Sequence, residues 1–153
     1  ANATAGFAKE VEEVNLLQLI SRHTNEARLK NRKYKINCEP ELTLRGRPNA
    51  LSRLVGNLVT NAFRHAKSVA VSVEDDGQDI QILVDDNGPG IPLSKMEEVF
   101  RPFIRLDEAR NQDEAGTGLG LSIARDIARL HGGDITLEKS PMGGLRAAAR
   151  LPH

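Results

Sequence analysis

A column of polar side chains follows one face of the helix that the sequence predicts most clearly. The column recurs at i, i+4, i+7 and i+8, the spacing of one side of a helix, and consists of Asn57, Asn61, Arg64 and His65. Amide oxygens are hard neutral ligands of the kind that Mg²⁺ accepts, and a guanidinium one turn further on neutralises phosphate oxygens. A solvated polar face, which most amphipathic helices have, explains the same pattern. The column therefore indicates a metal and phosphate site only in combination with other motifs.

A second motif begins where an apolar strand is expected to end, and it reads Asp85-Asp86-Asn87-Gly88-Pro89-Gly90-Ile91-Pro92. A carboxylate at a strand end that points into a cavity accepts a hydrogen bond from an exocyclic amine. Glycine has no Cβ, so Gly88 and Gly90 let a planar ring approach the backbone closely. The alternative is a polar turn, because Asp, Asn, Gly and Pro are the usual turn formers.

A glycine-rich loop precedes the last predicted helix and reads Gly116-Thr117-Gly118-Leu119-Gly120. The N–H groups and the positive dipole end of a helix start attract anions, most usefully phosphates. The spacing excludes a dinucleotide fingerprint, which needs G-x-G-x-x-G directly after a strand, and a Walker loop, which needs Gly-Lys-Ser/Thr. A purely structural loop remains the alternative.

A short motif with two phenylalanines, Phe100-Arg101-Pro102-Phe103, lies between these two loops. Core packing is the simpler interpretation. The functional interpretation is a hydrophobic anchor that sets where a nucleotide lid lies.

The elements that must position these motifs alternate between helices and strands. Apolar residues recur with helical period from Leu51 to Phe63, and Pro48 lies where a helix can start. The pattern also predicts helices at 14–30, 93–100 and 119–130, strands at 34–38, 42–45, 69–74, 80–85, 135–138 and 145–151, and a polar, mobile loop at 104–117. Short turns between consecutive strands favour antiparallel pairs. The expected fold class is an α/β two-layer sandwich, with a mixed, mostly antiparallel sheet and helices on one face.

Length and composition set wide limits. The 153 residues suit one domain, and we expect a linker remnant at 1–13 followed by the domain at 14–153. Cys38 is the single cysteine, so no disulfide forms within the chain. Lys plus Arg (21) balances Asp plus Glu (21), and aromatic residues make up 3%. Neither number favours a nucleic-acid partner, and no apolar run is as long as a membrane span.

The ordered set of motifs resembles the catalytic domain of bacterial sensor histidine kinases, in the superfamily shared with gyrase B, the heat-shock chaperone and MutL. The resemblance covers roughly residues 40–152. Its N, G1, F and G2 boxes are similar to residues 57–65, 86–90, 100–103 and 116–121, and the tail His131-Gly132-Gly133 with Ser140 favours the kinase branch. The resemblance implies the Bergerat fold and the binding of ATP or ADP with Mg²⁺.

The resemblance also implies a role for each matching residue. Asn61 would hold Mg²⁺, with Asn57 supporting the metal or the phosphates and Arg64 completing the catalytic set. Asp86 would bond the adenine amine, and the segment 104–117 would be the ATP lid. Further nucleotide contacts would come from His65, Gly88, Gly90, Ile91, Phe103, Gly116, Thr117, Gly118, Leu119 and Gly120. Many relatives have lysine at the position of Arg64 and an aromatic ring at that of His65.

One departure concerns the phosphorylated group. The family's acceptor histidine is followed by an acidic residue and Arg-Thr-Pro, whereas His23 precedes Thr24-Asn25, and the other histidines are His65, His131 and His153. The acceptor and its dimerisation domain are therefore expected on a separate segment, with a response regulator as an indirect partner. The isolated domain is expected to be monomeric and cytoplasmic. Three rivals stay open: a pseudokinase that serves as a docking module, a serine kinase of the anti-sigma-factor type, and a plain α/β domain with accidental motifs.

Overall fold

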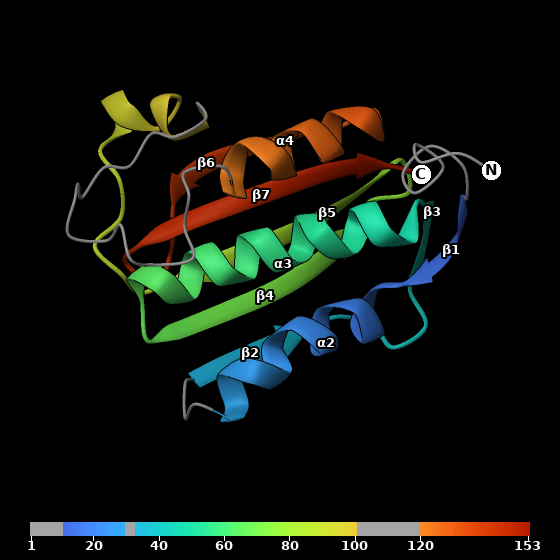
Figure 1. Ribbon diagram of the computed structural model, residues 1–153, viewed down its shortest axis with the longest axis horizontal. Helices are drawn as coiled ribbons and strands as arrows, with labels where there is room; N and C mark the ends of the chain where they lie inside the picture. The colour runs from blue at the N-terminus through green and yellow to red at the C-terminus, as the bar shows by residue number, and fades with distance from the viewer. Residues whose placement is uncertain (1–10, 30–32, 101–119) are drawn as a thin grey trace.

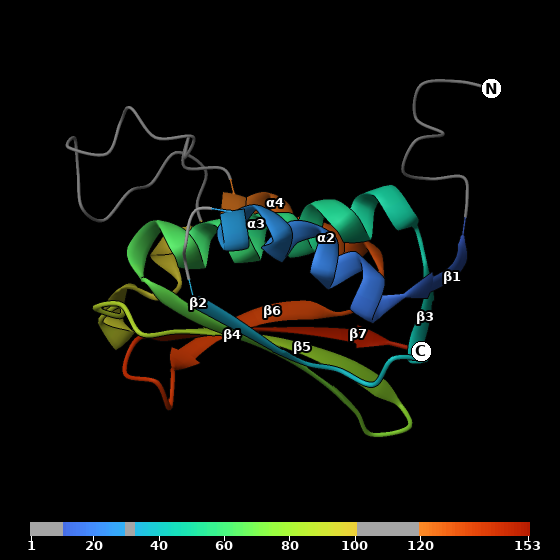
Figure 2. The ribbon, with the colours of Figure 1, turned by 90° about the horizontal axis from the view of Figure 1, so that it is seen from below.

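In a computed structural model, residues 11–29, 33–100 and 120–153 are described. Two sheets and a layer of helices account for most of them (Figure 1). The larger sheet has five strands in the order β2-β4-β5-β7-β6. Its strands are β2 (Lys33–Asn37), β4 (Ser68–Asp75), β5 (Asp79–Asp86), β6 (Asp134–Lys139) and β7 (Leu145–Pro152). The helices α2 (Leu16–Leu29), α3 (Pro48–His65) and α4 (Gly120–Leu130) lie on one face of this sheet (Figure 2).

The pairing confirms the expected mixed, mostly antiparallel sheet. β4 pairs with β5, β5 with β7 and β6 with β7, all antiparallel, whereas β2 pairs with β4 in parallel. The expected strands at 34–38 and 42–45 do not pair with each other. The second becomes β3 (Thr43–Gly46), which pairs with β1 (Glu12–Asn15) in a separate two-stranded sheet.

The start of the first helix was predicted wrongly. The helix was expected from Val14, but Val14 lies in β1 opposite Leu44, and α2 begins at Leu16. Glu12 and Glu13, which the sequence pattern placed in a linker, also lie in β1. Local periodicity cannot detect a strand whose partner lies 30 residues further on. The missed signal is Asn15, whose Oδ1 accepts the Gln18 N–H at 2.9 Å as an N-cap.

The sequence also predicted a short helix over 93–100. The structure has two 3-10 turns instead, η1 (Leu93–Lys95) and η2 (Glu98–Phe100). The loop expected at 104–117 lies outside the described residues, as does Leu119, where the last helix was expected to begin. No helix in the described ranges is long and apolar enough to cross a membrane.

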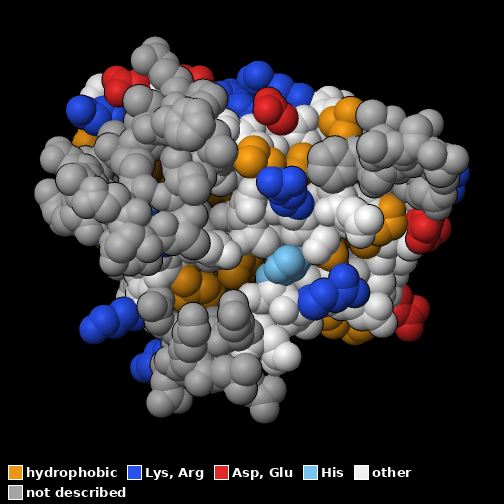
Figure 3. Space-filling model, in the orientation of Figure 1, with side chains coloured by type: hydrophobic (Ala, Val, Ile, Leu, Met, Phe, Trp, Pro, Cys, Tyr) orange, Lys and Arg blue, Asp and Glu red, His pale blue; other side chains and the backbone are white. Residues whose placement is uncertain are grey.

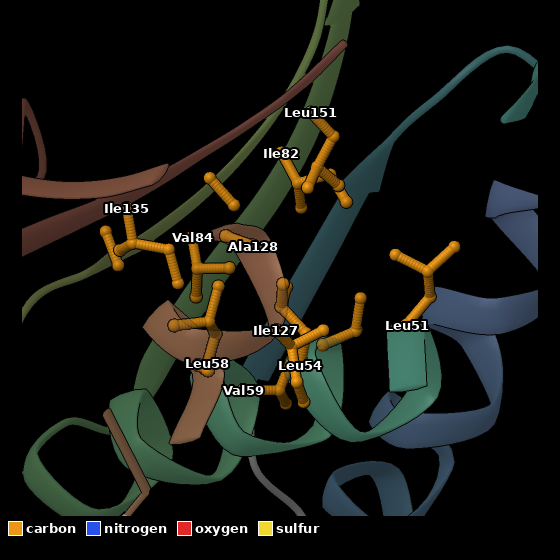
Figure 4. Close-up of a cluster of buried hydrophobic side chains, with 14 of the residues drawn as sticks. Leu51, Leu54, Leu58, Val59, Ile82, Val84, Ile127, Ala128, Ile135 and Leu151 are labelled. Atoms are coloured by element: carbon orange, nitrogen blue, oxygen red, sulfur yellow. The ribbon is translucent and has the colours of Figure 1, made fainter. Parts of the chain in front are cut away.

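The core fills the space between the helices and the sheet. The apolar face of α3 supplies Leu51, Leu54, Leu58 and Val59, and α4 supplies Ile127 and Ala128 (Figure 4). From the sheet, alternate residues of β5 point toward the helices, and they are Ile80, Ile82 and Val84. This alternation places the next residue of the series, Asp86, on the same helix-facing side.

The tail His131-Gly132-Gly133 ends α4 and ties it to α3. The Gly133 N–H donates to Ala128 O at 2.8 Å and the Gly132 N–H to Arg129 O at 3.0 Å, with φ 88° at Gly132, as in a Schellman motif. The His131 ring then bridges two helices. Its Nε2 accepts the Arg47 N–H at 3.1 Å, so Nδ1 carries the proton donated to Ile127 O at 2.9 Å.

Candidate functional site

The carboxylate of Asp86 lies at the end of β5 and is almost fully buried, with 3% of the residue exposed. Its Oδ1 accepts two backbone hydrogen bonds, from Gly88 N at 2.9 Å and from Leu145 N at 3.1 Å. Within the described part of the chain, the hydrogen bonds to this carboxylate go to Oδ1. Oδ2 is thus the acceptor that can serve a ligand, because a carboxylate accepts on both oxygens.

Its neighbour Asp85 has a different environment. Successive strand residues face opposite sides of a sheet, so Asp85 faces away from the helices. Asp85 accepts two hydrogen bonds from Arg146, from Nε at 2.7 Å and from Nη2 at 3.1 Å. This hydrogen bonding, which is larger than the opposing effect of burial, raises the pKa of Arg146. Of the acidic pair, only Asp86 faces the helix layer.

Gly88 and Gly144 pack around Asp86 with no room for a side chain. A Cβ on Gly88 would collide with the carbonyl oxygen of His65 at the end of α3. A Cβ on Gly144 would collide with Asp86 Oδ1, and would lie 2.6 Å from both Asp86 O and Gly88 N. Gly144 N also donates to Asp86 O at 3.1 Å. These contacts join the end of β5, the turn after it and the turn before β7.

Gly144 and Leu145 were missed as site residues by the sequence analysis, which placed them only in a hairpin. The signal in the sequence was the Gly143-Gly144 pair. Of the two, Gly143 has the positive φ that favours glycine, whereas Gly144 does not. A second glycine in a hairpin turn is a sign of close backbone approach. Gly90 has φ 77°, and a Cβ at this position would lie 3.6 Å from Gly144 O. Ile91 is partly buried against the core.

The polar column of α3 runs along the edge of this region. Asn57, toward the middle of the helix, donates from Nδ2 to Gly120 O at 3.1 Å, and so contacts the first residue of α4. His65, at the other end, has its carbonyl against Gly88. At about 1.5 Å per residue, these two positions lie about 12 Å apart along the axis. Asn61 and Arg64 lie between them and are partly exposed.

The structure thus places along the C-terminal half of α3 the residues Asn57, Asn61, Arg64, His65, Asp86, Gly88, Gly90 and Gly120. Phe103 and the glycine-loop residues Gly116, Thr117, Gly118 and Leu119 lie outside the described residues. Their expected contacts stay predictions.

Phe100, the first phenylalanine of the short motif, is buried and belongs to the core. The guanidinium of Arg125 on α4 lies over its ring, 4.1 Å from the centroid. The same guanidinium bonds Glu97 at 3.1 and 3.3 Å and Asp134 at 2.9 Å. Arg125 therefore holds η2 against α4 and β6. For the first phenylalanine the simpler interpretation, core packing, is confirmed.

This cluster shifts the pKa of Asp134 strongly. Burial is the largest single effect and raises the pKa, but the hydrogen bonds from Arg125, from the Ile135 backbone and from Arg129 together outweigh it. They lower the pKa from 3.8 to about 2. The cluster is thus a structural tie beside the site, and its carboxylate remains charged at neutral pH.

His23, His131 and His153 each make a hydrogen bond within the domain. The Nε2 of His23 lies 2.9 Å from Ser52 Oγ on α3, and its ring packs on Gly56. Burial, followed by the charge of Arg22, lowers the pKa of His23 although the bond to Ser52 opposes this. His153 contacts Asp75 Oδ1 at 2.8 Å.

Comparison with known proteins gives these residues a context. Residues 46–153 match the family model described as histidine kinase-, DNA gyrase B- and HSP90-like ATPase. The sensor histidine kinase GtrS of Pseudomonas aeruginosa is 39% identical over 145 residues, which are 95% of this chain and 30% of GtrS. The sensor histidine kinase CpxA of Escherichia coli is 46% identical over 112 residues, which are 71% of this chain and 24% of CpxA.

A solved structure agrees with the sequence matches. The mycobacterial sensor histidine kinase MprB superimposes with a TM-score of 0.80 at 25% identity, over 94% of this chain and 97% of that one. This chain spans less than a third of the length of GtrS and CpxA. The chain belongs to the family of histidine kinase-, DNA gyrase B- and HSP90-like ATPases, and its sequence and fold are those of the ATP-binding catalytic domain of a sensor histidine kinase.

Proposed function

We propose that this domain binds Mg-ATP and transfers the γ-phosphoryl group to a histidine on a separate dimerisation and phosphoacceptor domain, as part of two-component signal transduction. The observation that carries the proposal is the buried Asp86 carboxylate, whose Oδ1 is held by Gly88 and Leu145. A carboxylate fixed in this way presents its second oxygen in one direction. We infer that Oδ2 accepts a hydrogen bond from the exocyclic amine of adenine.

The glycines beside Asp86 support the same assignment. Gly88 and Gly144 pack against backbone and carboxylate atoms, and Gly90 adopts φ 77°. A base ring that stacks on this turn meets no Cβ there. We infer that the ring lies between this turn and the end of α3, with Ile91 and Phe103 as apolar neighbours.

The triphosphate then extends along α3 toward α4. We propose that Arg64 and the amides of the glycine loop from Gly116 to Gly120 bind phosphate oxygens. The residues of this chain fit Mg²⁺ as a nucleotide-borne ion, because Mg²⁺ in such sites takes one or two protein oxygens together with phosphates and waters. Asn61 would supply an amide oxygen, and the described residues contain no group of three or more His, Cys, Asp or Glu that would form a cage. When bound, Mg²⁺ neutralises charge on the β- and γ-phosphate oxygens.

The proposed reaction needs little covalent chemistry from this chain. An imidazole nitrogen attacks the γ-phosphorus, the N–P bond forms as the bond to the β,γ-bridging oxygen breaks, and ADP leaves. The domain contributes by orienting the phosphate chain and by stabilising its charge. We place the attacking histidine on another segment, since His23, His131 and His153 are each engaged in hydrogen bonds within the domain.

Further partners follow from this role as proposals. A response regulator would take the phosphoryl group from that histidine, and the domain would work in the cytoplasm, where ATP is abundant. On the face over the helices, basic side chains lie in the middle, at the top and at the lower left, and most acidic side chains lie toward the top and the right edge (Figure 3). The isolated domain is proposed to be monomeric.

Calorimetric titration with ATP and ADP, with and without Mg²⁺, tests the proposal. Micromolar affinity corresponds to about −8 kcal/mol. Asp86→Asn should weaken binding by roughly 1.5–3 kcal/mol, because a buried charged hydrogen bond is lost. Asp85→Asn is the matched control, since Asp85 is equally buried but bonded to Arg146 on the other face. Its nucleotide affinity should equal that of the wild type.

Two results would overturn the proposal. If the wild type binds no nucleotide at millimolar concentration, the domain is a docking module. If it binds nucleotide but phosphorylates a supplied protein with an acid-stable rather than an acid-labile bond, the acceptor is a serine and not a histidine.

A further inference from the structure

We propose that Asn57 is a positioning residue that acts through its amide hydrogens. By donating to the carbonyl of Gly120, it holds the start of α4 at the nucleotide site; the inference rests on the proposed function and deepens it. An oxygen-only role for Asn57, as support for Mg²⁺ or phosphate, does not account for the contact that the side chain makes.

The geometry fixes which arm of the amide is used. Asn57 and Gly120 are 63 residues apart in the chain, and the Nδ2···O distance is 3.1 Å. A backbone carbonyl only accepts hydrogen bonds, so the NH₂ group and not Oδ1 must face it. The side chain is partly buried between α3 and α4. If its NH₂ group were removed, water would not freely replace the hydrogen bond to the Gly120 carbonyl.

The position of the Gly120 carbonyl affects the start of α4. It is the first carbonyl of the helix, and the earliest amide that can pair with it is that of Ala124. Leu121 and Ala124 anchor the first turn in the core. Gly120 itself has no side chain, and no described atom lies within 4 Å of a Cβ built there. Among the described residues, Asn57 is thus the side chain that contacts the Gly120 carbonyl directly, while Leu121 and Ala124 anchor the rest of the turn.

Asn61 does not share this contact. It lies four residues further along α3, and in the parts of the chain that the structure describes it makes no hydrogen bond to α4. We infer that the two asparagines have different roles: Asn57 donates to α4, and Asn61 would supply the oxygen for the proposed Mg²⁺. Both positions are asparagine because the first needs a donor and the second needs an acceptor.

Asn57→Asp separates the two roles. The carboxylate has the shape of the amide and keeps an oxygen that Mg²⁺ accepts, but it removes the donor and sets an oxygen against the Gly120 carbonyl. In the nucleotide-free domain, amide hydrogen exchange of Ala124 should become at least threefold faster. Mg-ATP affinity at saturating Mg²⁺ should fall at least tenfold. Thr60→Asp adds the same charge at an exposed position on the same helix and should change neither quantity.

The outcomes distinguish this inference from the proposed function. An unchanged exchange rate at Ala124 in Asn57→Asp would overturn the contact. If the variant bound Mg-ATP as tightly as the wild type does, Asn57 would work through its oxygen. If the wild type binds no nucleotide, the proposed function fails, while the exchange measurement still decides whether Asn57 holds α4. Should Asn57→Asp not fold, NMR of the wild type decides: the side-chain NH₂ of Asn57 should exchange more slowly than that of Asn61, and equal rates would overturn the contact.

Discussion

The backbone N–H of Leu145 donates a 3.1 Å hydrogen bond to Asp86 Oδ1, and so joins the end of β5 to the start of β7, 59 positions later. The preceding residue, Gly144, donates from its N–H to the carbonyl oxygen of Asp86 at 3.1 Å. Two consecutive residues, the last of the β6–β7 turn and the first of β7, thus fix both the backbone and the side chain of Asp86. The orientation of the proposed adenine acceptor is therefore set by a turn that never needs to touch the nucleotide.

Gly144→Ala should reduce nucleotide affinity at least tenfold and lower the free energy of unfolding by about 1–3 kcal/mol, the usual cost of overpacking. The reason is that a Cβ at this position would collide with Asp86 Oδ1 and approach Gly88 N to 2.6 Å, so the carboxylate must move. Calorimetry and urea unfolding measure the two effects.

The adjacent Gly143 provides the control for this variant. It has φ 102°, and a Cβ there has no described atom within 4 Å. After glycine, Asn tolerates positive φ best, so Gly143→Asn should cost about 1 kcal/mol of stability and leave affinity unchanged. Equal affinities in Gly144→Ala and the wild type would contradict the role given to this turn.

Arg125→Met should loosen η2 from α4. The substitution keeps the apolar stem but removes the guanidinium that lies 4.1 Å from the centre of the Phe100 ring and bonds Asp134 at 2.9 Å. Loss of the cation–π contact alone is worth about 0.5–1 kcal/mol. Hydrogen exchange of the amides from Glu98 to Phe100 should therefore become faster, and the melting temperature should fall.

Arg129→Met is the comparison for Arg125. Arg129 also bonds Asp134, at 3.2 Å, but its side chain is 55% exposed and has no contact with Phe100 among the described residues. It should leave exchange at residues 98–100 as in the wild type. Identical exchange in both variants would mean that Phe100 is held by core packing alone.

The stability of the domain should decline in acid because of Asp134. Its pKa in the folded state is about 2, below the ordinary 3.8, so the unfolded chain takes up the proton first as the pH falls. The stabilisation is complete above about pH 4 and is lost as the pH falls toward 2. The shift sets an upper limit of about 2.5 kcal/mol, and since 33% of the side chain is exposed, screening reduces this to about 1 kcal/mol.

Asp134→Asn tests this origin of the acid sensitivity. Urea unfolding between pH 2 and pH 6 should show a flatter profile for the variant than for the wild type, with lower stability at neutral pH. A variant profile parallel to that of the wild type would assign the acid sensitivity to other carboxylates.

Much of the fold could be predicted from local patterns. The apolar period of α3 and the alternation in β4, β5 and β7 gave the right element types and nearly the right bounds. The errors fall where a distant partner decides. Val14 continues a helical pattern by itself, yet it lies in a strand because Leu44 pairs with it.

The chemical motifs were also visible in the sequence, but not their supports. Asp86 was identified from its position between an apolar strand and a glycine turn, while Gly144 looked like an ordinary hairpin residue. Likewise, the sequence placed Asn57 and Asn61 on one helix face, and the resemblance gave Asn57 only a supporting role toward the metal or the phosphates. Only the approach of Gly120 gives Asn57 a donor's role.

The sequence by itself determined most of the helices and strands, and which residues have the chemistry for a nucleotide, because side-chain periodicity and turn residues act locally. The tertiary structure alone decided the parallel pairing of β2 with β4. It also decided which of Asp85 and Asp86 faces the helices, and which residues bind each carboxylate. Those partners lie about sixty residues away along the chain, so their contacts depend on strand register and helix packing across the whole core, which no local pattern specifies.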